Sequence, residues 1–255
     1  MARAVTGFIT RSFITKSAVI IKAIVGNSVQ LLTNSLLLGL GTVIGNQVSQ
    51  RLAYHRSPHP MPHQFADMLD HPWRLRYRDP IDTVAILGIA AGMTVLDLGC
   101  GTGTFTVEMA RMVGPDGSVH AVDIQRSILQ RAEARIAAAR VSAAVAFHHG
   151  GAYALPLETS SVDLAVVLAT FSQIPDKARA LAELRRVLKP GGRLAVSEEL
   201  PNPAYILPAT NRAWVEPAGF LFAGQSGSLF CYTQLFLNDK DETVIEGEAT
   251  VVVGQ

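Results

Sequence analysis

The chain has 255 residues, of which 49% are hydrophobic, and its mean hydropathy is positive at +0.26. That length suits one domain with an appendage, and that hydropathy is high enough for a membrane-facing segment to be considered. The formal net charge of +1 gives no reason to expect a nucleic-acid partner. The two cysteines, Cys100 and Cys231, cannot build a disulfide framework, and no Cys/His cluster has zinc spacing, so no metal is expected. A reducing compartment fits best, either the cytoplasm or an organelle matrix.

The N-terminal part of the chain differs in charge from the rest. Before Asp67 there are no acidic residues and six basic ones: Arg3, Arg11, Lys16, Lys22, Arg51 and Arg56. Residues 23–50 carry no charge at all, although Asn27, Gln30, Asn34 and other polar residues interrupt the apolar stretches. We therefore separate residues 1–56 from the remainder as a hydrophobic, basic, helical segment.

Three interpretations of this segment stay open. It can be a membrane anchor or interfacial hairpin formed by residues 20–50, since about 20 residues suffice to span a bilayer. It can be a targeting presequence, because such presequences are basic, rich in serine and free of acidic residues. It can also be an ordinary oligomerisation helix, which would make the protein an oligomer.

Residues 57–79 are interpreted as a linker, because Pro58, Pro60 and Pro62 prevent a helix there. Residues 80–237 then alternate between strand and helix patterns, and residues 238–255 form a tail. The alternation predicts an α/β domain with a doubly wound, mostly parallel, seven-stranded sheet and a C-terminal antiparallel hairpin. The expected helices are 80–87, 104–113, 127–140 (capped by Ser127) and 177–188; the expected strands are 94–98, 118–122, 145–148, 164–168 and 193–197, with a hairpin at 220–223 and 229–235.

A glycine loop directly follows the first predicted strand. It carries Gly99, Gly101 and Gly103, and Asp123 lies 20 residues beyond the last of them, at the end of the second strand. In a doubly wound sheet this places the Asp123 carboxylate beside the ribose of a bound nucleoside. A dinucleotide fingerprint needs a further glycine or alanine, but Thr104 and Thr106 occupy the two possible positions. Asp97 suits a ligand with a cationic end, which favours an amino-acid nucleoside over a dinucleotide.

Four segments in order resemble the class I S-adenosylmethionine-dependent methyltransferases, in particular the type 11 group that includes the quinone-ring C-methyltransferases. They are VLDLGCGTG (95–103), HAVDIQ (120–125), SSVDLAVVLATFSQIPD (160–176) and LAELRRVLKPGGRLAVSEE (181–199). The resemblance covers about residues 80 to 236 and implies S-adenosylmethionine as the cofactor. It does not indicate the methyl acceptor.

The resemblance also implies a set of cofactor-binding residues. The methionine end of S-adenosylmethionine would lie against the glycine loop, its ribose against Asp123, and its adenine against Ile124 and the loop after the third strand. The full set is Asp97, Gly99, Cys100, Gly101, Gly103, Asp123, Ile124, Ala152 and Tyr153. The chain departs from the family pattern at Gly151, where an acidic residue is usual, so a side-chain contact to the adenine amino group is lost.

The catalytic residue is not evident from the sequence, because methyl transfer from a sulfonium needs alignment more than a general base. The candidates for a base are His148 and His149 after the third strand, and Glu198 or its neighbour Glu199 at the end of the fifth. Phe171, Gln173 and Tyr205 are candidates for lining the acceptor site.

Two functions remain as alternatives. The first is a membrane-associated methyltransferase acting on a small apolar or amphipathic acceptor, such as a quinone precursor or a lipid. The second is a non-catalytic methyltransferase-like subunit or assembly factor of a membrane complex, motivated by Gly151 and the missing base. An NAD-dependent oxidoreductase is disfavoured by the incomplete fingerprint.

Overall fold

The computed structural model describes residues 32–239, so the basic residues from Arg3 to Lys22 and most of the predicted tail lie outside the described part. The chain divides into two compact units, with the boundary between Leu52 and Ala53. Residues 32–56 are helical, and apolar side chains such as Leu38 and Ile44 are exposed on that helix. Within residues 32–239, no helix is both long enough and apolar enough to cross a bilayer.

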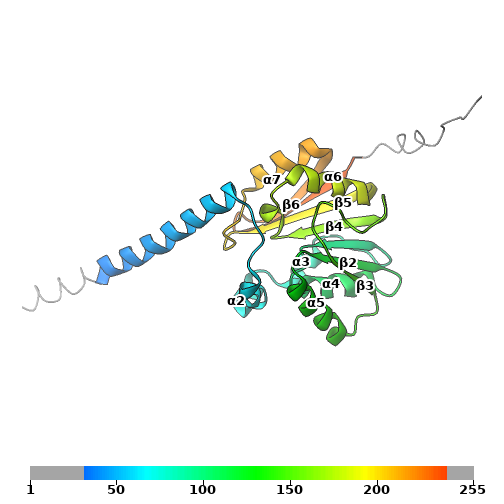
Figure 1. The fold of residues 1–255 in the computed structure, drawn as a ribbon, viewed down its shortest axis with the longest axis horizontal. Coiled ribbons are helices and arrows are strands. Elements are labelled where there is room, and N and C mark those ends of the chain that lie inside the picture. Colours follow the sequence, from blue (N-terminus) through cyan, green and yellow to red (C-terminus); the bar gives the residue numbers. More distant parts are fainter. Residues whose placement is uncertain (1–31, 240–255) are drawn as a thin grey trace, which may run out of the picture. The chain divides into compact units, whose positions relative to one another are not determined.

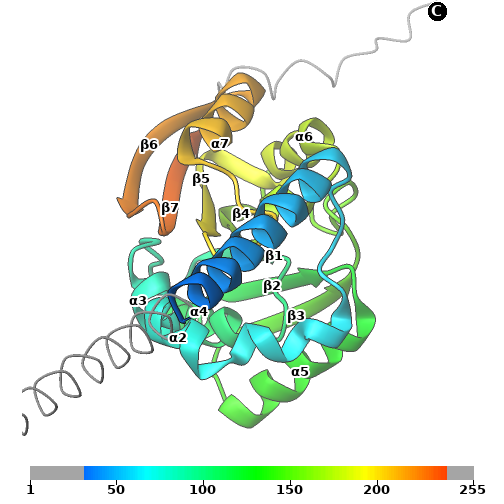
Figure 2. The same ribbon diagram turned by 90° about the vertical axis from the view of Figure 1, so that its left-hand side faces the viewer.

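The second unit is built on a seven-stranded sheet with the order β3-β2-β1-β4-β5-β7-β6. The first five strands pair in parallel, and β7 pairs antiparallel with both β5 and β6. Figures 1 and 2 show β3 at one edge of the sheet and β6 at the other. The strands are β1 Thr94–Leu98, β2 Ser118–Asp123, β3 Ala144–His149, β4 Val162–Leu168, β5 Leu188–Glu199, β6 Phe220–Gly227 and β7 Cys231–Asn238. The predicted parallel sheet with a C-terminal hairpin is confirmed.

Helices cover both faces of this sheet. In Figure 1, α3, α4 and α5 lie on one face, and α6 and α7 lie on the other. The helical segments are η1 His63–Asp70, α2 Pro72–Tyr77, α3 Pro80–Ala85, α4 Thr104–Val113, α5 Arg126–Ala139, η2 Phe171–Gln173, α6 Lys177–Val187, α7 Pro208–Val215 and η3 Glu216–Ala218.

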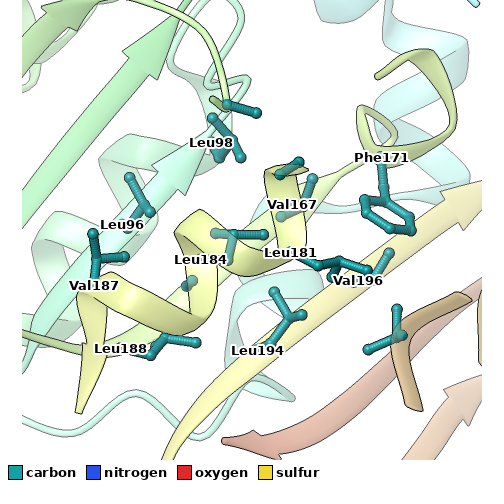
Figure 3. Close-up of a cluster of buried hydrophobic side chains, with 14 of the residues drawn as sticks. Leu96, Leu98, Val167, Phe171, Leu181, Leu184, Val187, Leu188, Leu194 and Val196 are labelled. Carbon is teal, nitrogen blue, oxygen red and sulfur yellow. The ribbon is translucent and has the colours of Figure 1, made fainter. Parts of the chain in front are cut away.

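The central strands are largely apolar because both of their faces are buried; Asp97 of β1 and Asp163 of β4 are exceptions. On one face, Leu181 and Leu184 of α6 pack toward Leu194 and Val196 of β5 (Figure 3). On the other face, a second cluster joins α3 and α4 to alternate residues of β1, β2 and β4. Burying side chains of this size contributes roughly 1.5–3 kcal/mol each, so these clusters hold the strand ends, and thus the site, in place.

Two local predictions need correction. Residues 57–62 have no regular structure, as the prolines predicted, but η1 and α2 occupy residues 63–77, where the sequence analysis placed linker. His71 caps α2, which begins with Pro72, a favoured first helical residue. The second correction concerns α5: it begins after Gln125 with no side-chain cap, so Ser127 lies within the helix and does not cap it.

Candidate functional site

The glycine loop has the backbone that its sequence predicts. Gly99, Gly101 and Gly103 all have positive φ, between 56° and 79°, which residues with a Cβ rarely adopt. A Cβ on Gly99 would lie 2.4 Å from Thr170, which follows β4, so glycine there lets two strand ends meet closely. Cys100 is buried in this loop and burial raises the pKa of its thiol, which fits packing and not reactivity.

Asp123 connects the end of β2 to this loop. Its Oδ2 accepts a hydrogen bond from the Gly101 amide at 3.0 Å, and its Oδ1 accepts one from the Gln125 amide at 2.9 Å. The side chain is buried, which raises its pKa, while these amides and nearby His149 lower it. The carboxylate is thus fixed by the backbone, and each oxygen keeps a lone pair that can accept a further hydrogen bond, as ribose hydroxyls would require.

Asp97 lies in β1, just before the loop, and is 2% exposed. Its pKa is raised to about 7, mainly by burial and further by the neighbouring Asp123, against the lowering effect of a 2.6 Å hydrogen bond from the Thr106 hydroxyl. Two carboxylates at the end of a parallel sheet, with no cation paired to Asp97 in the described residues, favour a ligand that carries positive charge.

The residues predicted to hold an adenine lie beyond Asp123. Ile124 is 55% exposed, and a Cβ on Gly151 would meet only the Ile124 side chain, so an apolar surface is open here. Ala152 is buried beside it. Tyr153 instead packs against the core, and its hydroxyl accepts a hydrogen bond from the Asp176 amide at the start of α6.

A segment preceding the sheet, residues 61–70, covers the carboxyl ends of the strands. The Met61 amide donates to Gln173 Oε1 at 2.8 Å, and the Met61 carbonyl accepts from Gln125 Nε2 at 2.9 Å. Met61 therefore bridges the residues that follow β4 and β2. Leu69 lies over the glycine loop, 3.1 Å from where a Gly101 Cβ would be.

Asp70 fastens the other end of this cover. Its carboxylate accepts hydrogen bonds from the hydroxyls of Thr102 and Thr104 and pairs with Arg135 at 2.7 Å. Because Thr102 belongs to the glycine loop, the cover is attached to the loop itself. Sequence reasoning missed this cover, since Met61 acts through its backbone and Asp70 resembles an ordinary surface residue.

The two glutamates at the end of β5 differ sharply, because neighbouring strand residues face opposite sides of a sheet. Glu199 pairs with Arg74 at 2.8 Å and with Arg78 at 3.0 Å; burial acts against its charge, but the two arginines lower its pKa below the usual value. Glu199 is thus a structural ion-pair partner. Glu198 is fully buried, and its Oε1 accepts only a 3.2 Å bond from the Ser172 amide.

The two candidate histidines, His148 and His149, also differ in the groups that they contact. His149 lies beside Asp123 in the strand register, and its Nε2 is 3.0 Å from the Ile124 carbonyl, so it stays at the cofactor edge. His148 turns to the other face, where its Nε2 lies 3.1 Å from Nδ1 of His120 in a stacked pair. His148 therefore packs against His120 of the neighbouring strand.

The His120–His148 pair predicts an acid-sensitive stability. Burial lowers the pKa of both rings, and the neighbouring ring lowers that of His120 further. The unfolded chain then binds more protons than the folded one, so stability falls as the pH drops below about 6.5, the unperturbed value. Urea unfolding at pH 7.5 and 5.5 should show this loss, and His148→Asn should reduce it. An equal loss in His148→Asn and the unsubstituted protein would contradict this origin.

Comparison with known proteins shows which family has this sequence pattern and fold. A family model described as a methyltransferase domain matches residues 89–216, half of the chain. The ubiquinone/menaquinone biosynthesis C-methyltransferase UbiE of Marinomonas sp. (strain MWYL1) is 39% identical over 116 residues, which are 46% of this chain and 46% of that protein. The demethylmenaquinone methyltransferase of Lactiplantibacillus plantarum is 36% identical over 116 residues, 46% of this chain and 49% of that protein. The matched region thus spans about half the length of these relatives.

A solved structure agrees with the fold. The SAM-dependent methyltransferase from Aquifex aeolicus superposes with a TM-score of 0.65 at 26% identity, covering 70% of this chain and 99% of that one.

Proposed function

Because the chain belongs to the methyltransferase domain family, we propose that it transfers a methyl group from S-adenosylmethionine to a small apolar or amphipathic acceptor, such as a quinone precursor. The observation that carries this proposal is the Asp123 carboxylate, held by the Gly101 and Gln125 amides at the end of β2. A nucleoside placed there would lie along the glycine loop.

The residues present fit this cofactor. Asp123 retains acceptor capacity for ribose hydroxyls, and the open apolar surface at Ile124 suits adenine. The buried Asp97 carboxyl, whose pKa is raised, would be stabilised in its charged form by a cationic ligand. When bound, S-adenosylmethionine supplies an activated methyl group on a sulfonium. The chain's task is then to orient both reactants and exclude water, for which the cover of residues 61–70 is suited.

The acceptor class is supported from two sides. The relatives matched over residues of this domain carry names that describe methylation in ubiquinone and menaquinone biosynthesis. In this chain, apolar side chains gather at the carboxyl end of β5: Tyr77 contacts both Trp73 and Phe230 edge-on, and Trp73 and Phe230 are 59% and 40% exposed. An exposed aromatic group of this kind suits an amphipathic partner.

We further propose that the protein works at a membrane surface, with its domain in a reducing compartment. The helical residues 32–52 carry exposed leucine, valine and isoleucine side chains without a charge before Arg51. Such a segment can lie in the interfacial region of a bilayer, where apolar acceptors are dissolved. Both cysteines are free thiols.

The test is an assay of the full chain with S-adenosylmethionine and a panel of reduced quinone precursors and lipids. We expect S-adenosylhomocysteine to form together with a product 14 mass units heavier than the acceptor, the ~14 Da that replacement of hydrogen by methyl adds when the cofactor supplies the group. If the folded protein binds neither S-adenosylmethionine nor S-adenosylhomocysteine, the proposed enzymatic function is refuted. The alternative function, a non-catalytic subunit of a membrane complex, would then be favoured.

Asp97 predicts how cofactor binding depends on pH. With its pKa raised to about 7, mainly by burial, Asp97 is largely protonated at pH 6. A cationic cofactor favours the carboxylate, so binding below pH 7 expels a proton, and affinity should rise by up to about tenfold per pH unit until pH 7 and then level off. Calorimetry with S-adenosylmethionine at pH 6 and 8, in buffers of different ionisation enthalpy, measures both effects. Asp97→Asn should bind without proton release; unchanged release would assign the proton to another group.

A further inference from the structure

Two buried polar atoms lie close together without partners at the ends of β4 and β5. Within residues 32–239, neither Glu198 Oε2 nor Ser172 Oγ has a hydrogen-bond partner. Glu198 is 0% exposed and Ser172 5% exposed. The two residues are nevertheless joined, because the Ser172 amide donates to the other carboxyl oxygen of Glu198 at 3.2 Å.

Leaving both atoms unpaired is costly, since each buried polar atom loses its hydrogen bonds to water. One hydroxyl group placed between them would satisfy both. Its O–H would donate to Glu198 Oε2, and its oxygen would accept from the Ser172 hydroxyl. The chemistry that completes this site is therefore that of a hydroxyl oxygen.

The site lies next to the cofactor region and not in an isolated part of the core. Ser172 belongs to η2, which begins after Thr170, the residue in close contact with Gly99 of the glycine loop. The next residue, Gln173, holds Met61 of the cover. Ser172 therefore lies on the same short turn that anchors the cover over the strand ends.

The surroundings of the pair are suited to an aromatic ring. Phe171 precedes Ser172 and is buried, and Tyr232 lies directly opposite Glu198 on β7. The Tyr232 hydroxyl is used in a hydrogen bond to the Ile206 carbonyl, so it does not compete for the Glu198 oxygen. The wall around the unpaired atoms is thus largely apolar.

We propose that Glu198 and Ser172 bind a phenolic hydroxyl of the methyl acceptor and that Glu198 accepts its proton. This inference rests on the proposed function and names the polar feature that the acceptor must carry. In the step, the O–H bond of the acceptor breaks, a new O–H bond forms at Glu198 Oε2, and the electron pair stays on the acceptor oxygen. The resulting phenolate is more electron-rich in its ring and therefore a better nucleophile at carbon.

The charges that face Glu198 are consistent with this role. The pKa of Glu198 is raised to about 7, mainly by burial and further by Glu199, against the lowering effect of the hydrogen bond from the Ser172 amide and of the Arg78 guanidinium. Lys177 at the start of α6 also interacts with Glu198, while its ammonium group lies over the Trp214 ring. A carboxyl group whose pKa lies near 7 can take up a proton and release it again during turnover at neutral pH.

The first test measures binding without turnover. Full-length protein saturated with S-adenosylhomocysteine is titrated under reducing conditions with 1,4-naphthohydroquinone and with 1,4-dimethoxynaphthalene, which lacks the O–H groups. We expect the hydroquinone to bind about tenfold more tightly, and Ser172→Ala and Glu198→Gln each to reduce this preference to about twofold, a change of about fivefold that corresponds to loss of one hydrogen bond of about 1 kcal/mol. Cofactor binding should stay unchanged, and Glu158→Gln, an exposed glutamate, is the matched control.

The second test follows turnover against pH. We expect kcat to rise with a midpoint near pH 7, and Glu198→Gln to lower kcat by about 100-fold or more, to abolish that rise and to raise KM by no more than the loss of binding, about fivefold, expected above. Ser172→Ala should mainly raise KM. If Glu198→Gln fails to fold, Ser172→Ala alone carries the binding test.

The outcomes separate this inference from the proposed function. Failure of the unsubstituted protein to bind S-adenosylhomocysteine would overturn both. Normal cofactor binding with equal affinity for the two naphthalenes, unaffected by either substitution, would overturn only the inference and assign the pair to an ordered water. An unchanged pH profile in Glu198→Gln would overturn the proton transfer.

Discussion

Asp123→Ala is expected to weaken S-adenosylhomocysteine binding by about 100-fold. The substitution removes a charged acceptor for two ribose hydroxyls, and each such hydrogen bond contributes about 1.5 kcal/mol, where 1.4 kcal/mol is a factor of ten in affinity. It also removes the bonds from the Gly101 and Gln125 amides, so the glycine loop loses its connection to β2. Calorimetric titration of the full chain measures the effect.

Two further variants make that result specific. Asp123→Asn retains one acceptor oxygen and should show an intermediate loss, while Asp116→Ala removes an exposed carboxylate and should bind normally. Binding within threefold of normal by a folded Asp123→Ala protein would mean that the nucleoside does not lie along this loop.

Arg78→Met is expected to destabilise the fold by about 3–5 kcal/mol. The Arg78 side chain is fully buried and bonds both Glu199, at 3.0 Å, and the Ser197 hydroxyl, at 2.6 Å. Methionine fills much of the volume but leaves the buried Glu199 carboxylate with Arg74 as its single partner and removes the donor to the Ser197 hydroxyl, and a buried charge that is only partly compensated is costly. Urea unfolding monitored by circular dichroism gives the change in the free energy of unfolding.

The surface ion pair of Arg212 with Glu216 provides the comparison. Arg212→Met should cost no more than about 1 kcal/mol, since exposed pairs contribute little. In the double variant Arg78→Met/Glu199→Gln the combined loss should be less than the sum of the two single losses, because both substitutions break the same ion pair. A cost below about 1 kcal/mol for Arg78→Met would show that water reaches Glu199.

The sequence predicted those parts of the fold and site that depend on local patterns. The β1 strand, the glycines at 99, 101 and 103 and Asp123 form one strand-loop-helix-strand unit, so their spacing determines their geometry. The mostly parallel sheet and its antiparallel hairpin followed from the alternation of elements and the resemblance to a known family, whereas the order of the strands came from the structure.

The remainder depended on contacts between distant residues. Nothing near Glu199 in the sequence distinguishes it from Glu198; the difference comes from Arg74 and Arg78, more than a hundred positions earlier. Residues 63–77 looked like linker because their helices are short and are stabilised by packing on the strand ends more than by their own propensity. Linear periodicity carries no information about such pairings.

The bridge made by Met61 has a consequence for variation at that position. Both of its hydrogen bonds use the backbone, so nearly any side chain at residue 61 preserves them. Proline is the exception, because it lacks the N–H that Gln173 accepts. A saturation library scored for function should therefore find position 61 permissive to most replacements and intolerant of proline, whereas Gln125 and Gln173 should each tolerate few. A segment that holds the strand ends together can in this way diverge freely in sequence while its role stays the same.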